Sequence, residues 1–417
     1  MNKKLISIVI FTLMITAFLP VIEGSNISYN FYDETQNSEK SVEPNINPIG
    51  SFVEWEKIFH TDFYSRGHCI QQTSDGGYIC IGDGFGHKIW LNKLDESGNV
   101  EWNQTYEWGQ YNHGWFVLET EDNGFILVGK NNDDDLWLIK TDEYGNMQWN
   151  RTHGPKRINS GQCIQQTNDG GYIIAGWTSP HNWLNCHNPW ILKVDSMGFE
   201  EWNKTIENPV YSKSYSVQQT PDNGYIIAGG KAYTASGNSD IWLIKTDING
   251  NVEWDKTFGN SETWNMAHSI DLTFEGGFII AGENLLIKTD EQGNEIWSIT
   301  LNCRSVQQTE DGGFIVTGPK NMILDHTNMG LTKIDNNGIV EWERSFGGFY
   351  DDCGNFVQQT KDRGYVLTGF RKSHVPGYSR NSFKYIDLWI VKTSERPRFS
   401  AIDIQLNNFF NCHPLLY

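Results

Sequence analysis

A repeated unit of about 47 residues constrains this chain more than any other feature of its sequence. Each unit holds four short apolar runs, seen most clearly between Cys163 and Thr205 in CIQQTNDGGYIIAG followed by WILKVDSMGFEEWNKT. Runs that resemble the first recur seven times, centred on Gln71, Leu118, Gln165, Gln218, Asp271, Gln307 and Gln358. Runs that resemble the fourth recur equally often, centred on Trp55, Trp102, Trp149, Trp202, Trp254, Trp297 and Trp342. Seven copies of one structural unit are therefore predicted.

The residue types within a unit indicate antiparallel strands. The runs are short and rich in Ile, Val, Trp and Tyr, which favour strands. Turn signals separate them: DGG or DNG follows the first run, as at Asp222–Gly224, and D-x-x-G-N follows the third, as at Asp142–Asn146. These residues tolerate the positive φ that tight hairpins require. Each unit is predicted to be a four-stranded meander.

The two ends of the repeat array favour a closed ring over an open solenoid. A run of the fourth type, Phe52–Phe59, precedes any first run, and the last full run, Asp387–Lys392, is of the third type. If the early run completes the unit that begins at Phe356, no bare sheet edge remains. We therefore predict an all-β, seven-bladed β-propeller over residues 49–393, closed by its N-terminal strand.

The segments outside the ring predict export. Lys3 and Lys4 precede an apolar stretch, Leu5–Ile22, so residues 1–24 read as a signal peptide, with an uncleaved anchor as the alternative. Residues 25–48 read as a polar linker, and residues 394–417 match no repeat. The ring is expected to be secreted or at the cell surface, with membrane contact only if the apolar stretch is retained.

Charge and cysteine content exclude some classes of partner and scaffold. The formal net charge is −19 with no basic block to offset it, which excludes nucleic acid as the expected partner. Seven cysteines without repeated spacing do not predict a disulfide framework. We expect a monomer.

The repeat also resembles a known family. The pattern D-x-x-G-N-x-x-W at Asp142–Trp149 resembles the tryptophan-docking motif of quinoprotein-like (PQQ-like) propeller repeats. The whole ring is similar to prokaryotic cell-surface proteins with DGGYIIAG and WLIKTD repeats. The resemblance implies the architecture, with the fourth-run tryptophans packed between adjacent blades, but it implies no enzyme. No cofactor-ligand cluster can be carried over to this chain, so no cofactor is expected.

A binding site is predicted on the face that carries the variable loops. Loops between second and third runs, and connections between units, vary in length and share one face, whereas the other face has short uniform turns. The loops between second and third runs are predicted to be nearly absent in unit five and long in units three, six and seven, at Gly176–Pro189, Gly318–Met329 and Gly369–Ile386. The position that opens the first run varies among the units, with His in two of them and a different residue in each of the other five, while its neighbours stay similar. Its residues are expected to converge at the ring axis as a ligand cup: His68, Trp115, Gln162, Tyr215, His268, Arg304 and Asn355. Ordinary sequence drift is the alternative interpretation.

Two other kinds of site are weaker hypotheses. Carboxylates on the variable face that could serve a glycoside hydrolase are Asp62, Asp351, Asp352 and Glu262. Metal candidates without firm ligand spacing are His181, Cys186 and His187, together with the run Asp133–Asp135. We therefore expect an exported, non-catalytic module that binds an extracellular glycan or protein. A polysaccharide-acting enzyme and a purely structural surface repeat protein are the alternatives.

Overall fold

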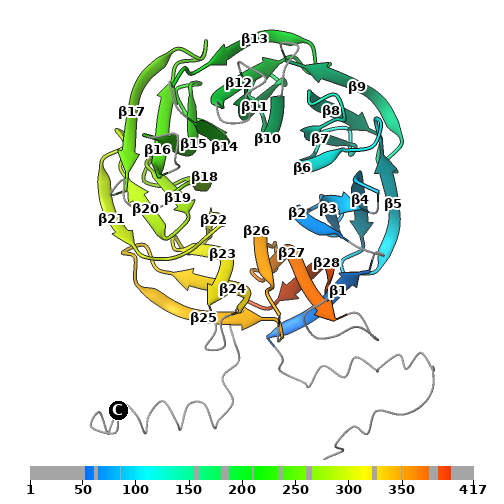
Figure 1. The fold of residues 1–417 in the computed structure, drawn as a ribbon. Helices are drawn as coiled ribbons and strands as arrows, with labels where there is room; N and C mark the ends of the chain where they lie inside the picture. The colour runs from blue at the N-terminus through cyan, green and yellow to red at the C-terminus, as the bar shows by residue number, and fades with distance from the viewer. Residues whose placement is uncertain are drawn as a thin grey trace, which may run out of the picture. The chain divides into compact units, whose positions relative to one another are not determined.

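A computed structural model of the chain contains seven four-stranded antiparallel sheets arranged radially around an axis (Figure 1). It describes residues 52–60, 64–84, 86–154, 159–179, 187–208, 211–233, 238–259, 265–321, 326–348, 350–374 and 384–395. The predicted all-β, seven-bladed propeller is confirmed. None of the described segments forms a helix with the length and apolarity that a membrane span needs.

Each blade runs from an innermost first strand to an outermost fourth strand (Figure 1). The first strands are β2 (Arg66–Gln72), β6 (His113–Glu119), β10 (Asn159–Gln166), β14 (Ser212–Gln219), β18 (Ala267–Leu272), β22 (Ser305–Gln308) and β26 (Cys353–Gln359). The second strands are β3 (Tyr78–Gly84), β7 (Phe125–Lys130), β11 (Tyr172–Thr178), β15 (Tyr225–Ala232), β19 (Phe278–Gly282), β23 (Phe314–Asn321) and β27 (Tyr365–His374). The third strands are β4 (Lys88–Leu94), β8 (Leu136–Thr141), β12 (Asn188–Val194), β16 (Ser239–Thr246), β20 (Leu285–Thr289), β24 (Thr327–Ile334) and β28 (Lys384–Thr393). The fourth strands are β5 (Val100–Tyr106), β9 (Met147–His153), β13 (Glu200–Thr205), β17 (Val252–Phe258), β21 (Glu295–Ile299), β25 (Val340–Phe346) and β1 (Val53–Phe59).

The ring closes through the strand that precedes the first repeat. β1 pairs antiparallel with β28, with Glu56 opposite Val391 and Ile58 opposite Trp389. Blade seven therefore has the order β1-β28-β27-β26 and joins the N-terminal strand to the last three strands. The predicted closure is confirmed, and the outer edge of β28 is covered.

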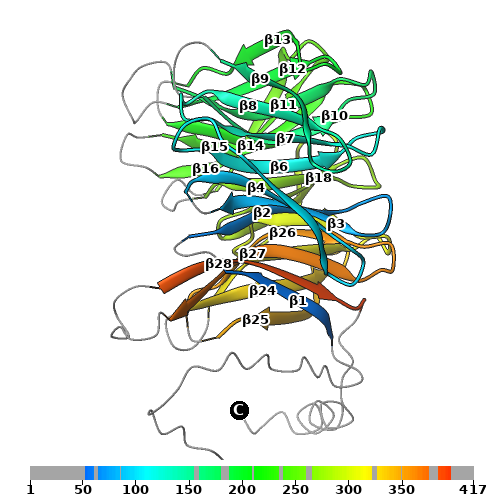
Figure 2. The ribbon, with the colours of Figure 1, turned by 90° about the vertical axis from the view of Figure 1, so that its right-hand side faces the viewer.

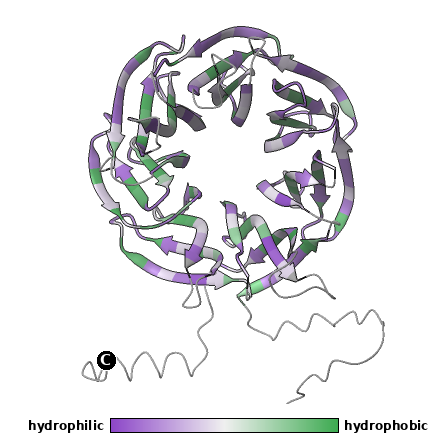
Figure 3. Ribbon diagram, viewed as in Figure 1, coloured by the Kyte–Doolittle hydropathy of each residue, from purple (hydrophilic) through white to green (hydrophobic). Residues whose placement is uncertain are grey.

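The apolar core lies between neighbouring blades. Middle strands such as β12 are buried at every residue, whereas outer strands such as β13 alternate between exposed and half-buried side chains. Figure 3 shows the same contrast, with hydrophilic residues predominating along the outermost strands. One cluster joins Ile79 and Leu91 of blade one to Val117 and Leu127 of blade two. A single blade cannot bury these faces alone, which is why the unit is repeated.

The fourth-strand tryptophans dock each blade onto the next. Trp102 of blade one packs in a tilted orientation against Phe125 of blade two, with ring centroids 5.8 Å apart. Its indole also lies next to the turn that contains Gly145. Gly145 has a φ of 77°, and a Cβ there would lie 2.7 Å from the indole, so the turn accommodates only glycine. Trp55 makes the equivalent contact with Tyr78 across the closure. The scaffold role expected from their fixed position is confirmed.

The repeated glutamine pairs bind backbone groups of neighbouring blades. Gln72 N donates to Gln358 Oε1 at 2.6 Å, and Lys361 N donates to Gln72 Oε1 at 2.8 Å. The same two contacts recur between blades three and four and between blades six and seven. The glutamines therefore satisfy backbone donors between blades, as expected for buried amides.

A buried lysine on each third strand holds the turn between first and second strands. Lys193 Nζ lies 2.9 Å from Asp169 Oδ2 and 2.9 Å from Glu201 Oε2, so the Asp of the DGG signal also serves as a counter-ion. The lysine, the hydrogen bonds from Thr167 and Gly171, and the nearby charge outweigh burial and lower the pKa of Asp169 to about 2.

Two of the expected long loops are in part longer strands. In blade six, β23 and β24 stay paired as far as Asn321 opposite Thr327, and in blade seven β27 and β28 stay paired as far as His374 opposite Lys384. The pairing runs five residues past Gly369 in blade seven and three residues past Gly318 in blade six, the latter as far as it runs past Gly229 in blade four. Figure 2 shows the blades from the side. Blade five has only Glu283 and Asn284 between its second and third strands, so its short loop is confirmed.

Candidate functional site

A β-bulge in the first strand aims one side chain per blade toward the axis. In six blades the pairing of first and second strands shifts at a single residue, which is left without a partner. That residue is the variable one: in blade three, Gly161 pairs with Gly176 and Cys163 pairs with Ala175, so Gln162 is the bulge. A bulge redirects the side chain and tightens the local twist. In blade six no bulge interrupts the described pairing, and Arg304 N donates directly to Thr317 O at 2.8 Å.

The last glycine of the YIIAG run lies where the first strand approaches the second strand too closely for a side chain. A Cβ on Gly176 would lie 1.8 Å from Ser160 O, and one on Gly129 would lie 2.0 Å from His113 O. The backbone just before each bulge therefore presses against the second strand where only hydrogen fits. The glycine accompanies the bulge in six blades. In blade six, where the described pairing has no bulge, a Cβ on Gly318 would still lie 2.7 Å from Asn302 O.

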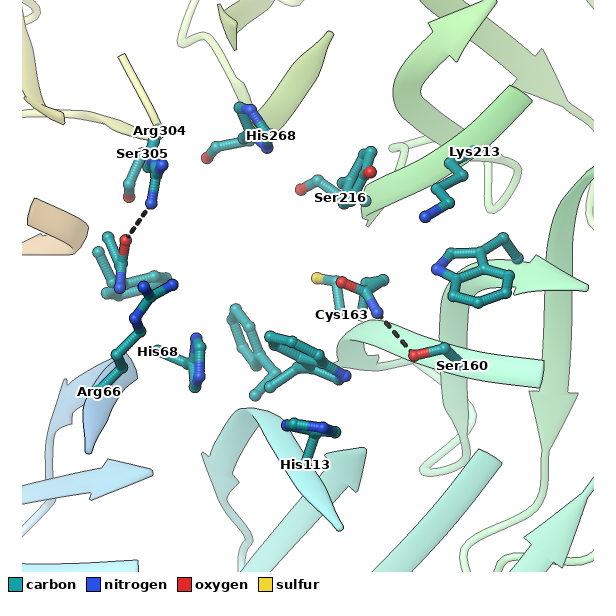
Figure 4. Close-up of a pocket in the computed structure, with 18 of the residues that line it drawn as sticks. Arg66, His68, His113, Ser160, Cys163, Lys213, Ser216, His268, Arg304 and Ser305 are labelled. Carbon is teal, nitrogen blue, oxygen red and sulfur yellow. Dashed lines mark hydrogen bonds between the residues drawn. The ribbon is translucent and has the colours of Figure 1, made fainter. Parts of the chain in front are cut away.

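The seven variable residues meet around one cavity of about 540 Å³ on the axis (Figure 4). The cavity, which we call the cup, is lined by His68, Trp115, Gln162, Tyr215, His268, Arg304 and Asn355, and by Arg66, His113, Phe116, Lys130, Ser160, Cys163, Trp177, Lys213, Ser216, Ser269, Ser305 and Phe356. The structure thus brings together all seven residues proposed from the sequence. Their part in ligand binding stays a prediction.

Reasoning from the first strand alone missed two further sets of lining residues. Arg66, His113 and Lys213 lie two positions before a bulge, so strand alternation turns them to the same side. Lys130 and Trp177 follow the glycine that opposes a bulge on the second strand. That position also varies from blade to blade, reading Asp83, Lys130, Trp177, Gly230, Glu283, Pro319 and Phe370. A search for variable positions across both strands would have found it.

The cup is cationic although the chain is acidic. Four of its lining residues are Lys or Arg, and none of the described residues that line it is Asp or Glu. Lys213 Nζ lies 4.3 Å from the centroid of the Trp177 ring and 5.1 Å from that of Tyr211. Burial, with a smaller effect of Lys130, lowers the pKa of Lys213 to about 8. Because the whole chain has a net charge of −19, this concentration of positive charge is a local property of the cup.

A carboxylate behind the cup, that of Asp83, lies against two of its histidines. Asp83 Oδ2 lies 2.9 Å from His68 Nε2 and 3.3 Å from His113 Nδ1. Burial alone would raise the pKa of Asp83, but the two imidazoles outweigh burial and lower it. Asp83 is therefore ionised beside the two histidines. It does not line the cavity.

Aromatic rings form a track from the surface into the cup. Tyr111, which is 56% exposed, lies 4.9 Å from His87, and His87 lies 6.4 Å from His113. His113 stacks on Trp115 at 5.5 Å with an interplanar angle of 16°, and Trp115 meets His68 edge-on at 4.6 Å. We call these five rings the aromatic track; all distances are between ring centroids.

The two described carboxylates among those proposed for an enzyme, Asp351 and Asp352, do not line the cup. Asp351 Oδ2 lies 3.0 Å from Lys372 Nζ. Asp352 is buried, where it accepts hydrogen bonds from Lys372 N and Gly348 N, and burial raises its pKa despite these contacts. Both therefore bind the strands of blades six and seven together. Asp62 and Glu262 lie outside the described residues.

The metal candidates are only partly described. His187 packs between Trp177 and Tyr211, with ring centroids 4.2 and 4.9 Å away, and burial, with Lys213 and Lys130, lowers its pKa to about 4. His181 and Cys186 lie outside the described residues. In the run Asp133–Asp135, Asp133 N and Asp135 N both bind Asn131 Oδ1 and Asp134 pairs with Lys130, which is the pattern of an ordinary side-chain-capped turn.

No family model and no curated protein matches this chain. Among solved structures, it is similar to Raptor from Chaetomium thermophilum at 10% identity and a TM-score of 0.54, over 82% of this chain and 29% of Raptor. It is also similar to a puromycin hydrolase at 12% identity and a TM-score of 0.51, over 75% of this chain and 52% of that protein. A protein of unknown function from Bacteroides caccae matches at 13% identity and a TM-score of 0.44, over 68% and 94% of the two chains. At these identities the likeness shows the fold alone.

Proposed function

We propose that this protein is an exported, non-catalytic module that binds an extracellular glycan in the cup. One observation carries the proposal: a position that varies from blade to blade is the one that a bulge, present in six blades, directs into a single cavity. Variation confined to one exposed site on a rigid scaffold is the usual arrangement for a binding specificity.

The aromatic track favours a saccharide over a protein partner. Sugar rings pack their C–H faces against aromatic side chains, and the hydroxyl group of Ser160 and the amide of Gln162 supply hydrogen-bonding groups beside them. Tyr111 extends this surface beyond the cavity, which suits a chain of sugars whose end enters the cup.

The alternative of a polysaccharide-acting enzyme lacks support in the cup. Glycoside hydrolysis uses two carboxyl groups that flank the scissile bond. The described lining of the cup offers none, and Asp351 and Asp352 are engaged by backbone and lysine groups. We also propose that the ring is related to quinoprotein-like repeats, because its tryptophans dock on the D-x-x-G-N turns, and that the relationship extends to scaffold only.

The test is a glycan array probed with the full-length chain, combined with a reducing-end assay on the same polysaccharides. Wild-type protein is expected to bind a subset of glycans without releasing reducing ends. Trp115→Ala and Tyr215→Ala are expected to weaken that binding at least tenfold, because each removes an aromatic face of the cup. Phe199→Ala is the matched control: Phe199 is 55% exposed in a turn between third and fourth strands, on the opposite face.

Three results would overturn the proposal. Release of reducing ends would make the protein an enzyme. Binding that survives both cup substitutions would move the site elsewhere. Failure to bind any glycan would leave a protein ligand or a structural role as the function. Near-ultraviolet circular dichroism of each variant checks that the ring is folded.

A further inference from the structure

The cationic side chains stand on opposite sides of the cup. Figure 4 shows Arg66 and Arg304 on one side and Lys213 on the other, with His268 and His113 at the rim between them. The described lining holds no carboxylate to neutralise these groups. Of the four Lys and Arg residues, only Lys130 has a described ion pair, with Asp134.

Lys213 is held in place without an ionic partner. Its ammonium group lies over Trp177 and Tyr211, and no hydrogen bond or ion pair to it is found among the described residues. Aromatic faces stabilise a cation less than a carboxylate does, and burial removes much of its water. The lowered pKa of Lys213 reflects that cost. An anionic ligand would supply the missing partner.

The two arginines are fixed by neutral groups. Arg304 Nη1 donates to Asn355 Oδ1 at 2.7 Å, and Asn355 Nδ2 in turn donates to Gly67 O at 2.8 Å. The Arg66 guanidinium lies between the rings of Tyr64 and Phe370, at 4.7 and 4.5 Å, and its buried Nε has no hydrogen-bond partner among the described residues. Both guanidinium groups are therefore oriented, yet retain donors for a carboxylate or a sulfate.

We infer that the ligand of the cup is an acidic oligosaccharide, with carboxylate or sulfate groups that bind Arg66, Arg304 and Lys213 while its sugar rings pack on the aromatic track. This inference rests on the proposed function and names the class of glycan. Two cationic sides suit a ligand that carries anionic groups on more than one sugar.

The experiment is a calorimetric comparison of oligogalacturonate with its fully methyl-esterified form. The two share every sugar and linkage and differ only in charge. The full-length chain is expected to bind the acid at least tenfold more tightly than the ester, and its affinity for the acid should fall with added salt. Desulfated and sulfated chondroitin oligosaccharides form a second matched pair. Both carry one carboxylate per disaccharide, so a difference between them measures what sulfate adds to the binding.

Lys213→Met and Arg304→Met are expected to remove most of the preference for the acid while leaving affinity for the neutral form within twofold. Lys204→Met on the outer strand β13 is the control, since the one described contact of that amine is with Asn251 Oδ1. Equal affinity for oligogalacturonate and its methyl ester, and for sulfated and desulfated chondroitin, with binding still lost in Trp115→Ala, would overturn the inference and leave the proposed function intact. If the wild-type chain binds no saccharide, both the inference and the proposed function are overturned.

Discussion

At the scale of single residues, Asp271 departs from the rule that neutral glutamines tie the blades together. It occupies the position held by Gln71, Gln165, Gln218, Gln307 and Gln358 in five other blades. Its side chain accepts hydrogen bonds from Gln308 N at 2.9 Å and from Leu272 N at 3.0 Å. Burial outweighs both contacts and raises the pKa of Asp271 from 3.8 to about 6. The charged form is therefore unfavourable in the folded ring.

Asp271→Gln is expected to stabilise the protein at pH 8. Because the folded-state pKa is raised, the folded chain holds the proton more tightly, and the resulting stability is present below about pH 4 and lost as the pH rises through about 6. The substitution should raise the free energy of unfolding by about 1–3 kcal/mol at pH 8, with little change at pH 4. Denaturant unfolding at the two pH values measures it. The exposed Glu291→Gln in the same blade is the control, and an equal effect of both would refute the explanation.

Ligand affinity is expected to fall as the pH rises past 8. Lys213 has a pKa of about 8 in the free protein, and a bound anion favours its charged form, so binding takes up a proton. Affinity for an acidic oligosaccharide should be roughly tenfold lower at pH 9 than at pH 7. The other groups that face Lys213 are Lys130, His187 and Tyr211; His187 has a pKa of about 4 and the pKa of Tyr211 is raised, so both are neutral. A Lys213→Met variant that keeps the full pH dependence would contradict this assignment.

At the scale of strands, the bulge determines which side chain of the first strand enters the cup, while the neighbouring residues pair with the second strand. The apolar runs and the DGG signals predict the strands and their turns, because both act locally. The bulge depends on how two strands pair, which periodicity in one strand does not reveal. Its one sequence signal is the repeated glycine at Gly176 and its equivalents. For the same reason the extended hairpins beyond Gly318 and Gly369 read as loops in the sequence.

Gly176→Ala is expected to disturb the bulge in blade three. The added methyl group would meet Ser160 O, a backbone atom that cannot rotate away, so the strands must separate locally. We expect a loss of roughly 2–3 kcal/mol in the free energy of unfolding, together with weaker glycan binding. Gly348→Ala is the matched control, because nothing lies within 4 Å of its added carbon. Thermal unfolding and calorimetry measure both effects; equal results for the two variants would show that the close approach is unimportant.

At the scale of the whole molecule, the ring depends on a strand far from its partner in sequence. β1 covers β28 and supplies Glu54 to the buried Lys392 and Glu56 to Trp389. The count of strand types at the two ends was enough to predict this closure. The face that carries the site also followed from topology. The charge of the cup did not, since it arises from side chains of separate blades that only the folded ring brings together.

Truncation tests the closure. A chain that begins at His60 lacks β1, so the outer edge of β28 is left bare and Lys392 loses one of its counter-ions. We expect a loss of more than about 3 kcal/mol in the free energy of unfolding, because an entire strand and the packing of Trp55 on Tyr78 are removed, and we expect self-association in size-exclusion chromatography. A chain that begins at Phe52 keeps the strand and should match the full-length chain. Equal stability of the two would contradict the closure.

The most direct test of the account is a crystal structure of the protein with the acidic oligosaccharide that it binds most tightly. The account predicts density on the axis, with an anionic group of the ligand within hydrogen-bond distance of Lys213 or Arg304 and a sugar ring against Trp115. Ligand density on the opposite face, on the outer strands, or in the cup without contact to these cations would contradict it.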